Sequence, residues 1–190
     1  MKMMITGANS GLGLRISNRY HADNYSRSEG WSIPEKSKEL AQVSLNYDVV
    51  INNAYDGTLG DSWHGFGQVK FLHELAMAWK ADDKIGHIIN IGGVGSEDLS
   101  PPFSGWETYN ANKRALKHLS LQWTQAFKQN QVQFRTSLLT IDRLDTPKSR
   151  SMPSWTGHAL DLDDVVDMLD LCLNLGAGSC IGEIVAWSRL

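Results

Sequence analysis

Cysteine is scarce in this sequence, with only Cys172 and Cys180 among 190 residues. Two cysteines near one end do not supply the disulfide framework of a small secreted protein. Cys172 lies within an apolar helical pattern, so we expect a reduced thiol in the core. The cysteine content therefore predicts an intracellular protein, and we expect it in the cytoplasm.

Long apolar runs and a large excess of one charge are also missing. No run reaches the roughly eighteen apolar residues of a membrane-spanning helix, and the few residues before Thr6 are too short for a signal peptide. The net charge is −3, from 18 Lys and Arg against 21 Asp and Glu. This balance gives no reason to expect an electrostatic partner such as nucleic acid or an anionic membrane. We therefore predict neither partner.

The common motifs of metal sites and of hydrolytic nucleophiles do not occur. His73-Glu74 is followed by Met77, where a zinc protease motif needs a second histidine. The other histidines show no paired ligand spacing, and there is no Cys-x-x-Cys. No serine lies in a Gly-x-Ser-x-Gly turn. We expect no metal and no serine hydrolase chemistry.

The residues that are present read as an ordinary globular chain, with 42% hydrophobic and 21% charged residues. We expect a single domain over 1–190, long enough to bury about 70% of its unfolded surface. Apolar runs and helical periodicity alternate along it. The expected strands are residues 3–5, 24–28, 48–52, 84–91, 134–141 and 183–187, and the expected helices are 11–21, 34–43, 68–80, 106–129 and 161–175. This alternation predicts an α/β fold, a doubly wound parallel sheet with helices on both faces.

The first strand enters the first helix through a turn that holds Gly7, Gly11 and Gly13. Such a turn leaves backbone N–H groups unpaired at the positive end of the helix dipole. Glycine also lets a ligand approach the backbone closely, so the turn is a candidate phosphate site. Its Gly-x-x-x-Gly-x-Gly spacing differs from the more common Gly-x-Gly-x-x-Gly fingerprint.

Three other polar segments follow expected strands: Asn52–Tyr55, Ile91–Ser96 and Asp142–Thr146. The carboxyl ends of parallel strands lie at one edge of a sheet, where ligands of this architecture bind. We therefore expect these segments to surround the glycine-rich turn in one site.

Tyr109 and Lys113 open the longest expected helix and lie one turn apart on the same face. A phenol with a pKa near 10 is a poor acid–base catalyst at neutral pH, and a nearby ammonium favours the phenolate. Tyr-x-x-x-Lys by itself is common on solvated helix faces. Its position after a strand of such a sheet favours a catalytic role.

Taken in order, Thr6–Gly13, Asn52-Asn-Ala54 and Tyr109-x-x-x-Lys113 resemble the motifs of the short-chain dehydrogenase/reductase family. Asp145-Thr-Pro147 and Ile181-Gly-Glu-Ile184 resemble further family segments, so the similarity covers nearly the whole chain. The resemblance implies a Rossmann-like sheet of about seven strands that binds NAD(H) or NADP(H). It also implies a homodimer or homotetramer that packs through helices 68–80 and 106–129.

The resemblance assigns roles to individual residues. Tyr109 would donate or accept the proton at the substrate oxygen, and Lys113 would hold the nicotinamide ribose and lower the tyrosine pKa. Thr146 would approach the carboxamide. The candidate cofactor-binding residues are Gly7, Asn9, Ser10, Gly11, Leu12, Gly13, Arg27, Asn53, Ala54, Tyr109, Lys113 and Thr146.

The chain departs from the family pattern at several positions. The usual serine of the strand before the catalytic helix falls on Gly93 by motif register and on Ser96 by its usual interval from the tyrosine, and we favour Ser96 as the catalytic serine. Gln68 stands in the region of an asparagine that supports a proton relay through water. Tyr55 replaces the glycine of Asn-Asn-Ala-Gly, and Ile141-Asp142 replaces a Pro-Gly that grips the nicotinamide.

Cofactor preference depends on the end of the second strand. An acidic residue there binds the ribose hydroxyls of NAD, whereas an arginine accommodates the 2′-phosphate of NADP. The sequence offers Ser26-Arg27-Ser28, which favours NADP(H) through Arg27. Asp23 would favour NAD(H) if the strand ended earlier.

These patterns predict an NAD(P)(H)-dependent oxidoreductase that interconverts a carbonyl and an alcohol on a small apolar substrate. Tyr109 and Lys113, with Ser96, would be its acid–base machinery. Loops 95–108 and 142–160 carry side chains that would wall an apolar substrate pocket: Phe103, Trp106, Met152 and Trp155. The alternative is a dinucleotide-binding sensor or scaffold with little catalysis, because the usual serine and asparagine are not in register.

Overall fold

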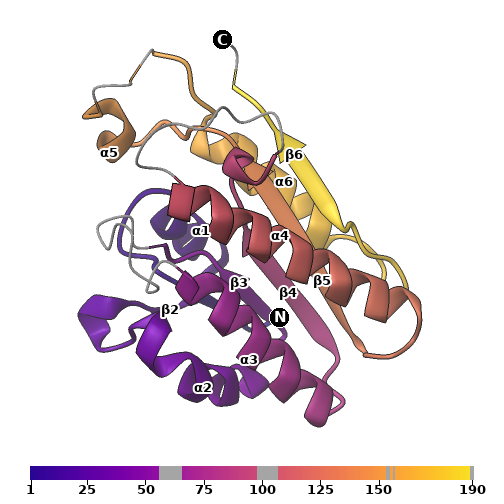
Figure 1. Ribbon diagram of the computed structural model, residues 1–190. Coiled ribbons are helices and arrows are strands. Elements are labelled where there is room, and N and C mark those ends of the chain that lie inside the picture. The colour runs from indigo at the N-terminus through magenta and orange to yellow at the C-terminus, as the bar shows by residue number, and fades with distance from the viewer. Residues whose placement is uncertain (56–65, 98–106, 153–154, 156, 189–190) are drawn as a thin grey trace.

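Six strands form one parallel sheet in the order β2-β1-β3-β4-β5-β6. The computed structural model describes residues 1–55, 66–97, 107–152, 155 and 157–188. Helices cover both faces of the sheet (Figure 1). The predicted doubly wound α/β architecture is therefore confirmed.

The elements alternate along the chain as the periodicity indicated. The strands are β1 (Met3–Thr6), β2 (Asp23–Tyr25), β3 (Val49–Asn52), β4 (Gly86–Ile91), β5 (Phe134–Ile141) and β6 (Glu183–Ala186). The α-helices are α1 (Gly11–Tyr20), α2 (Ile33–Val43), α3 (Gly67–Ala81), α4 (Glu107–Lys128), α5 (Pro147–Arg150) and α6 (Leu162–Leu173). The 3-10 turns are η1 (Arg27–Glu29), η2 (Ser44–Asn46) and η5 (Val94–Ser96).

The second strand is the element whose extent differs most from the prediction. It was expected over residues 24–28 but ends at Tyr25, and the chain then turns into η1. Its partner β1 ends at Thr6, and Gly7 N–H still donates to the Tyr25 carbonyl at 3.1 Å. Beyond that bond the backbone pairs locally, because the Ser26 carbonyl accepts from Glu29 N–H at 3.0 Å.

The resemblance implied about seven strands, whereas the described residues contain six. In a common doubly wound order, 3-2-1-4-5-6, one strand lies outside the second. Here the chain passes from β2 through α2 directly to β3, which pairs with β1. In the described part of the chain β2 is therefore an edge strand of the sheet.

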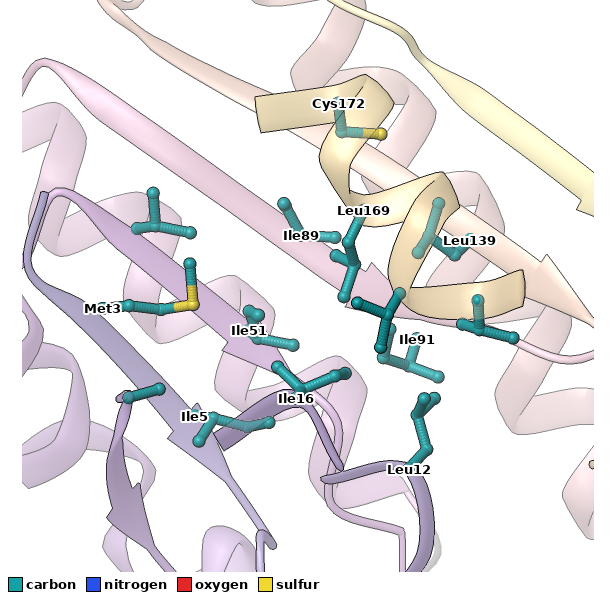
Figure 2. Packing of buried hydrophobic residues seen from close by; sticks show 14 of the residues in the cluster. Met3, Ile5, Leu12, Ile16, Ile51, Ile89, Ile91, Leu139, Leu169 and Cys172 are labelled. Atoms are coloured by element: carbon teal, nitrogen blue, oxygen red, sulfur yellow. The ribbon is translucent and has the colours of Figure 1, made fainter. Parts of the chain in front are cut away.

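One layer of the core packs α1 and α6 against the sheet. Figure 2 shows Ile16 of α1 and Leu169 of α6 with Ile51 and Ile89 from the central strands. All four side chains are fully buried. Burial of each such side chain stabilises the fold by about 1.5–3 kcal/mol.

The opposite layer packs α2, α3 and α4 against the other face. It contains Leu40, Leu72 and Leu116 of these helices with Val50 and Ile88 of the strands. Neighbouring strand residues point to opposite faces, which is why both faces of β3 and β4 are apolar. The two layers hold the sheet rigidly, so the loops at its carboxyl edge have fixed starting points.

Within the described residues, no helix combines the length and the apolar character needed to cross a membrane.

Candidate active site

The glycine-rich turn connects β1 to α1 in a conformation that requires glycine. Gly7 has φ 71° and Gly11 has φ 53°, in the left-handed region that glycine adopts without strain. A Cβ on Gly13 would overlap the Gly7 carbonyl oxygen and lie 2.6 Å from the side-chain nitrogen of Asn53. The turn is therefore packed backbone to backbone at the start of α1.

The first turn of α1 is open to an anion. Ser10, its N-cap residue, makes no side-chain capping hydrogen bond, and the first turn contains no acidic residue. The N–H groups of such a turn carry the positive end of the helix dipole and lack intrahelical partners. This is the donor set that a phosphate needs, so the turn fits the pyrophosphate of a dinucleotide.

Thr6 joins the glycine-rich turn to the segment that follows β3. Its fully buried hydroxyl oxygen accepts hydrogen bonds from the backbone N–H groups of Asn53 and Ala54, both at 3.1 Å. The Asn53 side chain donates in turn to the carbonyl oxygens of Thr6 and Gly7, both at 3.0 Å. The predicted neighbours Gly7, Asn53 and Ala54 are thus brought together at the carboxyl edge.

β2 and the segment that follows it border the same turn. Ala8 N–H donates to Asn24 Oδ1 at 3.0 Å, and the Asn9 side chain donates to the hydroxyl of Ser28. Arg27 lies between these contacts in η1 and is exposed. Asp23 instead begins β2 opposite Met4, and its carboxylate accepts from the Tyr47 hydroxyl at 2.7 Å. Of the two residues considered for cofactor preference, Arg27 is the one beside the turn.

Lys113 is buried beneath the opening of α4. It is only 4% exposed, and its ammonium donates to Gln68 Oε1 at 2.7 Å and to the Ile91 carbonyl at 3.2 Å. The ammonium also lies 5.6 Å from the centre of the Tyr109 ring. The i, i+4 spacing therefore places the two predicted side chains together, as the sequence indicated.

Tyr55 completes an aromatic enclosure around this pair. Its ring meets the Tyr109 ring edge to face, with centroids 5.0 Å apart. Its centroid is also 5.0 Å from the ammonium of Lys113, within cation–π range. The replacement of a family glycine by Tyr55 thus alters the immediate surroundings of both candidate catalytic groups.

Burial shifts the pKa values of the pair in opposite directions. Burial lowers the pKa of Lys113 to about 7, because the charged form loses its hydration. Burial first, then the neighbouring Tyr55 and Asp142, raises the pKa of Tyr109 to about 12. The resemblance implied a lowered tyrosine pKa, whereas burial raises the pKa of Tyr109 in this structure. At neutral pH Tyr109 is therefore a protonated phenol.

The position facing the Tyr109 hydroxyl belongs to Gly93. A Cβ built on Gly93 would overlap that hydroxyl, so the two are in direct contact. The Ser96 hydroxyl donates instead to Glu97 Oε1 at 3.1 Å, and no hydrogen bond joins it to Tyr109 in the described part of the chain. Gly93, the alternative in motif register, is thus the residue that the structure places at the tyrosine.

Ser96 belongs to a polar network that fixes η5. Glu97 pairs with Lys117 of α4 at 2.7 Å, and Lys117 also pairs with Glu183 of β6 at 3.0 Å. Thr140 of β5 donates to the same Glu183 oxygen at 2.6 Å. These contacts hold the loop after β4 against α4 and orient Ser96 toward Glu97.

Thr146 lies next to Gly11 of the glycine-rich turn. A Cβ on Gly11 would lie 3.5 Å from its Cγ2, so the two residues face each other. Its hydroxyl oxygen caps the short helix α5 by accepting from Ser149 N–H at 3.1 Å. The loop after β5 is therefore positioned next to the candidate cofactor site.

Gln68 is the side chain of the candidate site whose contact with Lys113 the sequence did not predict. It stands in the region where the family carries asparagine, which was the available signal, but its direct bond to Lys113 depends on side-chain length and packing. Phe103 and Trp106, predicted to wall a substrate pocket, lie outside the described residues. The searched residues contain no group of three or more His, Cys, Asp or Glu able to hold a metal.

Comparison with solved structures finds proteins with a similar fold. A short-chain dehydrogenase from Burkholderia cenocepacia J2315 in complex with NADP matches with a TM-score of 0.72 and 19% identity, over 97% of this chain and 89% of that one. Serine dehydrogenase from Escherichia coli matches with a TM-score of 0.69 and 18% identity, over 98% and 97% of the two chains. A 3-ketoacyl-(acyl-carrier-protein) reductase from Brucella melitensis complexed with NADH matches with a TM-score of 0.68 and 15% identity, over 96% of each chain.

The chain therefore has the fold of the short-chain dehydrogenases. No protein-family model matches the sequence, and no curated protein matches it either. All three solved structures are less than 20% identical to this chain, so the similarity establishes the fold alone. The function has to be argued from the site.

Proposed function

We propose that this chain is a short-chain dehydrogenase/reductase that interconverts a carbonyl and an alcohol with NADP(H). The observation that carries the proposal is the enclosure of Tyr109 and Lys113 at the carboxyl edge that also holds the open N-terminus of α1. A dinucleotide-binding turn and an acid–base pair at one sheet edge are the parts that such a reaction requires.

The residues of the turn and of the neighbouring strand ends would hold the cofactor. The N–H groups of Gly11, Leu12 and Gly13 would bind the pyrophosphate, with Asn9 and Ser10 beside them. Asn53, Ala54 and Thr146 would line the remainder of the site, and Lys113 would bind the nicotinamide ribose. Bound nicotinamide would supply or accept the hydride at the substrate carbon.

Tyr109 handles the proton at the substrate oxygen. With a pKa of about 12 it is protonated at neutral pH, which suits it to donate a hydrogen bond and then the proton to a carbonyl oxygen. Ser96 stays a prediction, because its hydroxyl would first have to leave Glu97 to orient the substrate. A small apolar substrate agrees with the apolar side chains of loops 95–108 and 142–160.

Arg27 carries the preference for NADP(H). It lies in η1 beside the phosphate-binding turn, whereas Asp23 lies at the start of β2, where its carboxylate accepts from Tyr47. A guanidinium at this position pairs with the 2′-phosphate of NADP(H). The ribose hydroxyls of NAD(H) are instead bound by a carboxylate.

A second candidate is a dinucleotide-binding sensor or scaffold with little catalysis. It is favoured by the contact of Gly93 with Tyr109, where the family pattern has a serine. Self-association through α3 and α4 belongs to either candidate, since Met77 and Leu121 are exposed apolar residues on these helices. Light scattering after size-exclusion chromatography measures it directly.

The two candidates are separated by NADPH consumption against a panel of ketones, aldehydes and quinones. We expect turnover that Tyr109→Phe reduces by about 100-fold or more, because the phenylalanine keeps the ring and removes only the proton donor. Tyr20→Phe is the matched control, since Tyr20 bonds Asp170 on the far side of α1. NADPH binding without any turnover that depends on Tyr109 would favour the sensor or scaffold.

A further inference from the structure

The side chain of Gln68 has a single consistent orientation. Its Nε2 faces two backbone carbonyl oxygens, those of Asn52 at 3.2 Å and Ile91 at 3.3 Å. Only the donating end of an amide satisfies two acceptors, so Oε1 must point the other way. There it accepts from the ammonium of Lys113 at 2.7 Å.

The ammonium of Lys113 depends on this acceptor. It has three N–H groups and donates one to Gln68 and one to the Ile91 carbonyl. A buried charge without hydrogen-bond partners is strongly disfavoured, so the shorter of these two bonds stabilises the protonated form. The rings of Tyr55 and Tyr109 lie beside the ammonium, with their centres 5.0 Å and 5.6 Å from it.

The polypeptide behind Gln68 is fixed as well. The Asn52 side chain donates to the Gln68 carbonyl at 3.0 Å and to Asn90 Oδ1 at 2.9 Å. Asn52, Gln68 and Asn90 are each no more than 1% exposed. This network joins the first turn of α3 to the ends of β3 and β4, so the oxygen that faces Lys113 cannot move away.

The other groups around the ammonium add no carboxylate contact among the described residues. Tyr109 comes from α4 itself and Tyr55 from the segment after β3, and both present ring faces. From β4 and α3 come the neutral Ile91 carbonyl and Gln68. Asp142, after β5, acts on Tyr109.

We propose that Gln68 is a positioning residue that favours the protonated form of Lys113 and fixes the position of its ammonium. The relevance of this arrangement to catalysis rests on the proposed function, but the arrangement itself does not. Gln68 acts through Lys113 and touches neither substrate nor cofactor.

The test follows the titration of Lys113 by NMR in protein labelled with carbon-13 at the lysine side chains, with Lys113→Arg identifying its signal. Gln68→Met keeps the length of the side chain and removes both the acceptor and the donor. We expect the titration midpoint of Lys113 to fall by at least one pH unit. Gln42→Met, at an exposed position of α2, should leave it unchanged. An unchanged midpoint in folded Gln68→Met would overturn the proposal.

A second variant keeps the proposal testable if Gln68→Met does not fold. Gln68→Glu places a carboxylate against the ammonium, and we expect the Lys113 midpoint to rise by at least one pH unit. An unchanged midpoint there overturns the proposal equally. A purely structural role for Gln68 would move neither midpoint.

The pH dependence of NADPH affinity separates this proposal from the proposed function. If Lys113 binds the ribose, the pH profile of the NADPH dissociation constant should shift with the Lys113 midpoint in both variants. If the Lys113 midpoint shifts but the affinity for NADPH does not depend on Lys113, the role of Gln68 is supported and the proposed function is rejected. Turnover that depends on Tyr109 and Lys113, with an unshifted midpoint in the variants, would reject the role of Gln68 alone.

Discussion

Single residues around Lys113 depart from the family pattern that the sequence resembles. Tyr55 encloses the ammonium with an aromatic ring, Gln68 accepts its hydrogen bond, and Gly93 contacts the tyrosine hydroxyl. Each of these residues stands where the family pattern has another. The tyrosine and lysine of the proposed acid–base pair match the pattern, while the groups around them do not, so we expect the pH behaviour of the pair to be the property in which this chain differs most.

The proposed preference for NADP(H) rests on one exposed residue, Arg27. We expect Arg27→Ala to lower the ratio of NADPH to NADH specificity by about tenfold, because a charge-assisted contact to the 2′-phosphate is lost. The fold should not change, since Arg27 is exposed in η1. Steady-state kinetics with each cofactor measures the ratio.

Asp23→Asn is the control for this experiment. The carboxylate of Asp23 accepts from Tyr47 at the start of β2, so its removal should leave the preference unchanged. A preference that survives Arg27→Ala, or that changes in Asp23→Asn, would contradict the assignment to Arg27.

Among the elements, the turn from β1 into α1 tolerates the least change. Gly13→Ala should lower the free energy of unfolding by about 1–3 kcal/mol, because the new Cβ overlaps the Gly7 carbonyl and presses on Asn53. Urea denaturation measures this loss, and NADPH titration should show weaker binding because the N-terminus of α1 is displaced.

The comparison position for this change is Gly178. It lies in the loop before β6, and a Cβ there would meet no atom within 4 Å. Gly178→Ala should leave stability unchanged or raise it slightly by restricting the unfolded chain. Equal stability losses in the two variants would show that the close packing at Gly13 is not the cause.

The elements themselves were largely predictable from the sequence, and the reasons are local. The apolar run Val49–Asn52 and the helical periodicity of Glu107–Lys128 depend only on the chain near them. The end of β2 was mispredicted, because it is set by the length of its partner β1. Tyr109 and Lys113 could be found from their spacing, whereas the bond from Gln68 and the position of Gly93 depend on how three elements pack.

The stability of the whole molecule should depend on pH through a histidine outside the site. His87 of β4 is buried, with its Nε2 bonded to the Ser137 hydroxyl at 2.8 Å. Burial, with a smaller contribution from Arg135, lowers its pKa to about 3. In the unfolded chain His87 binds a proton below pH 6.5, whereas in the folded chain it binds one only below about pH 3. Stability contributed by neutral His87 is therefore present above pH 6.5 and is lost as the pH falls from there to 3.

We expect the free energy of unfolding to fall by about 1.4 kcal/mol per pH unit within that window because of this group. Denaturant titrations from pH 7 to pH 4 measure the slope. His87→Gln should flatten it, and His118→Gln, at an exposed position of α4, should not. Parallel slopes in wild type and His87→Gln would show that acid destabilisation has another origin.

The lengths of the strands across the sheet have a consequence for how copies of the chain can meet. β5 in the interior runs from Phe134 to Ile141, whereas the edge strands β2 and β6 are three and four residues long. Short edges offer few unpaired backbone groups, which guards against extension of the sheet from one molecule to the next. Growth of a cross-β aggregate is disfavoured from the folded state, and the oligomer proposed above would bury side chains of helices rather than continue the hydrogen-bond ladder.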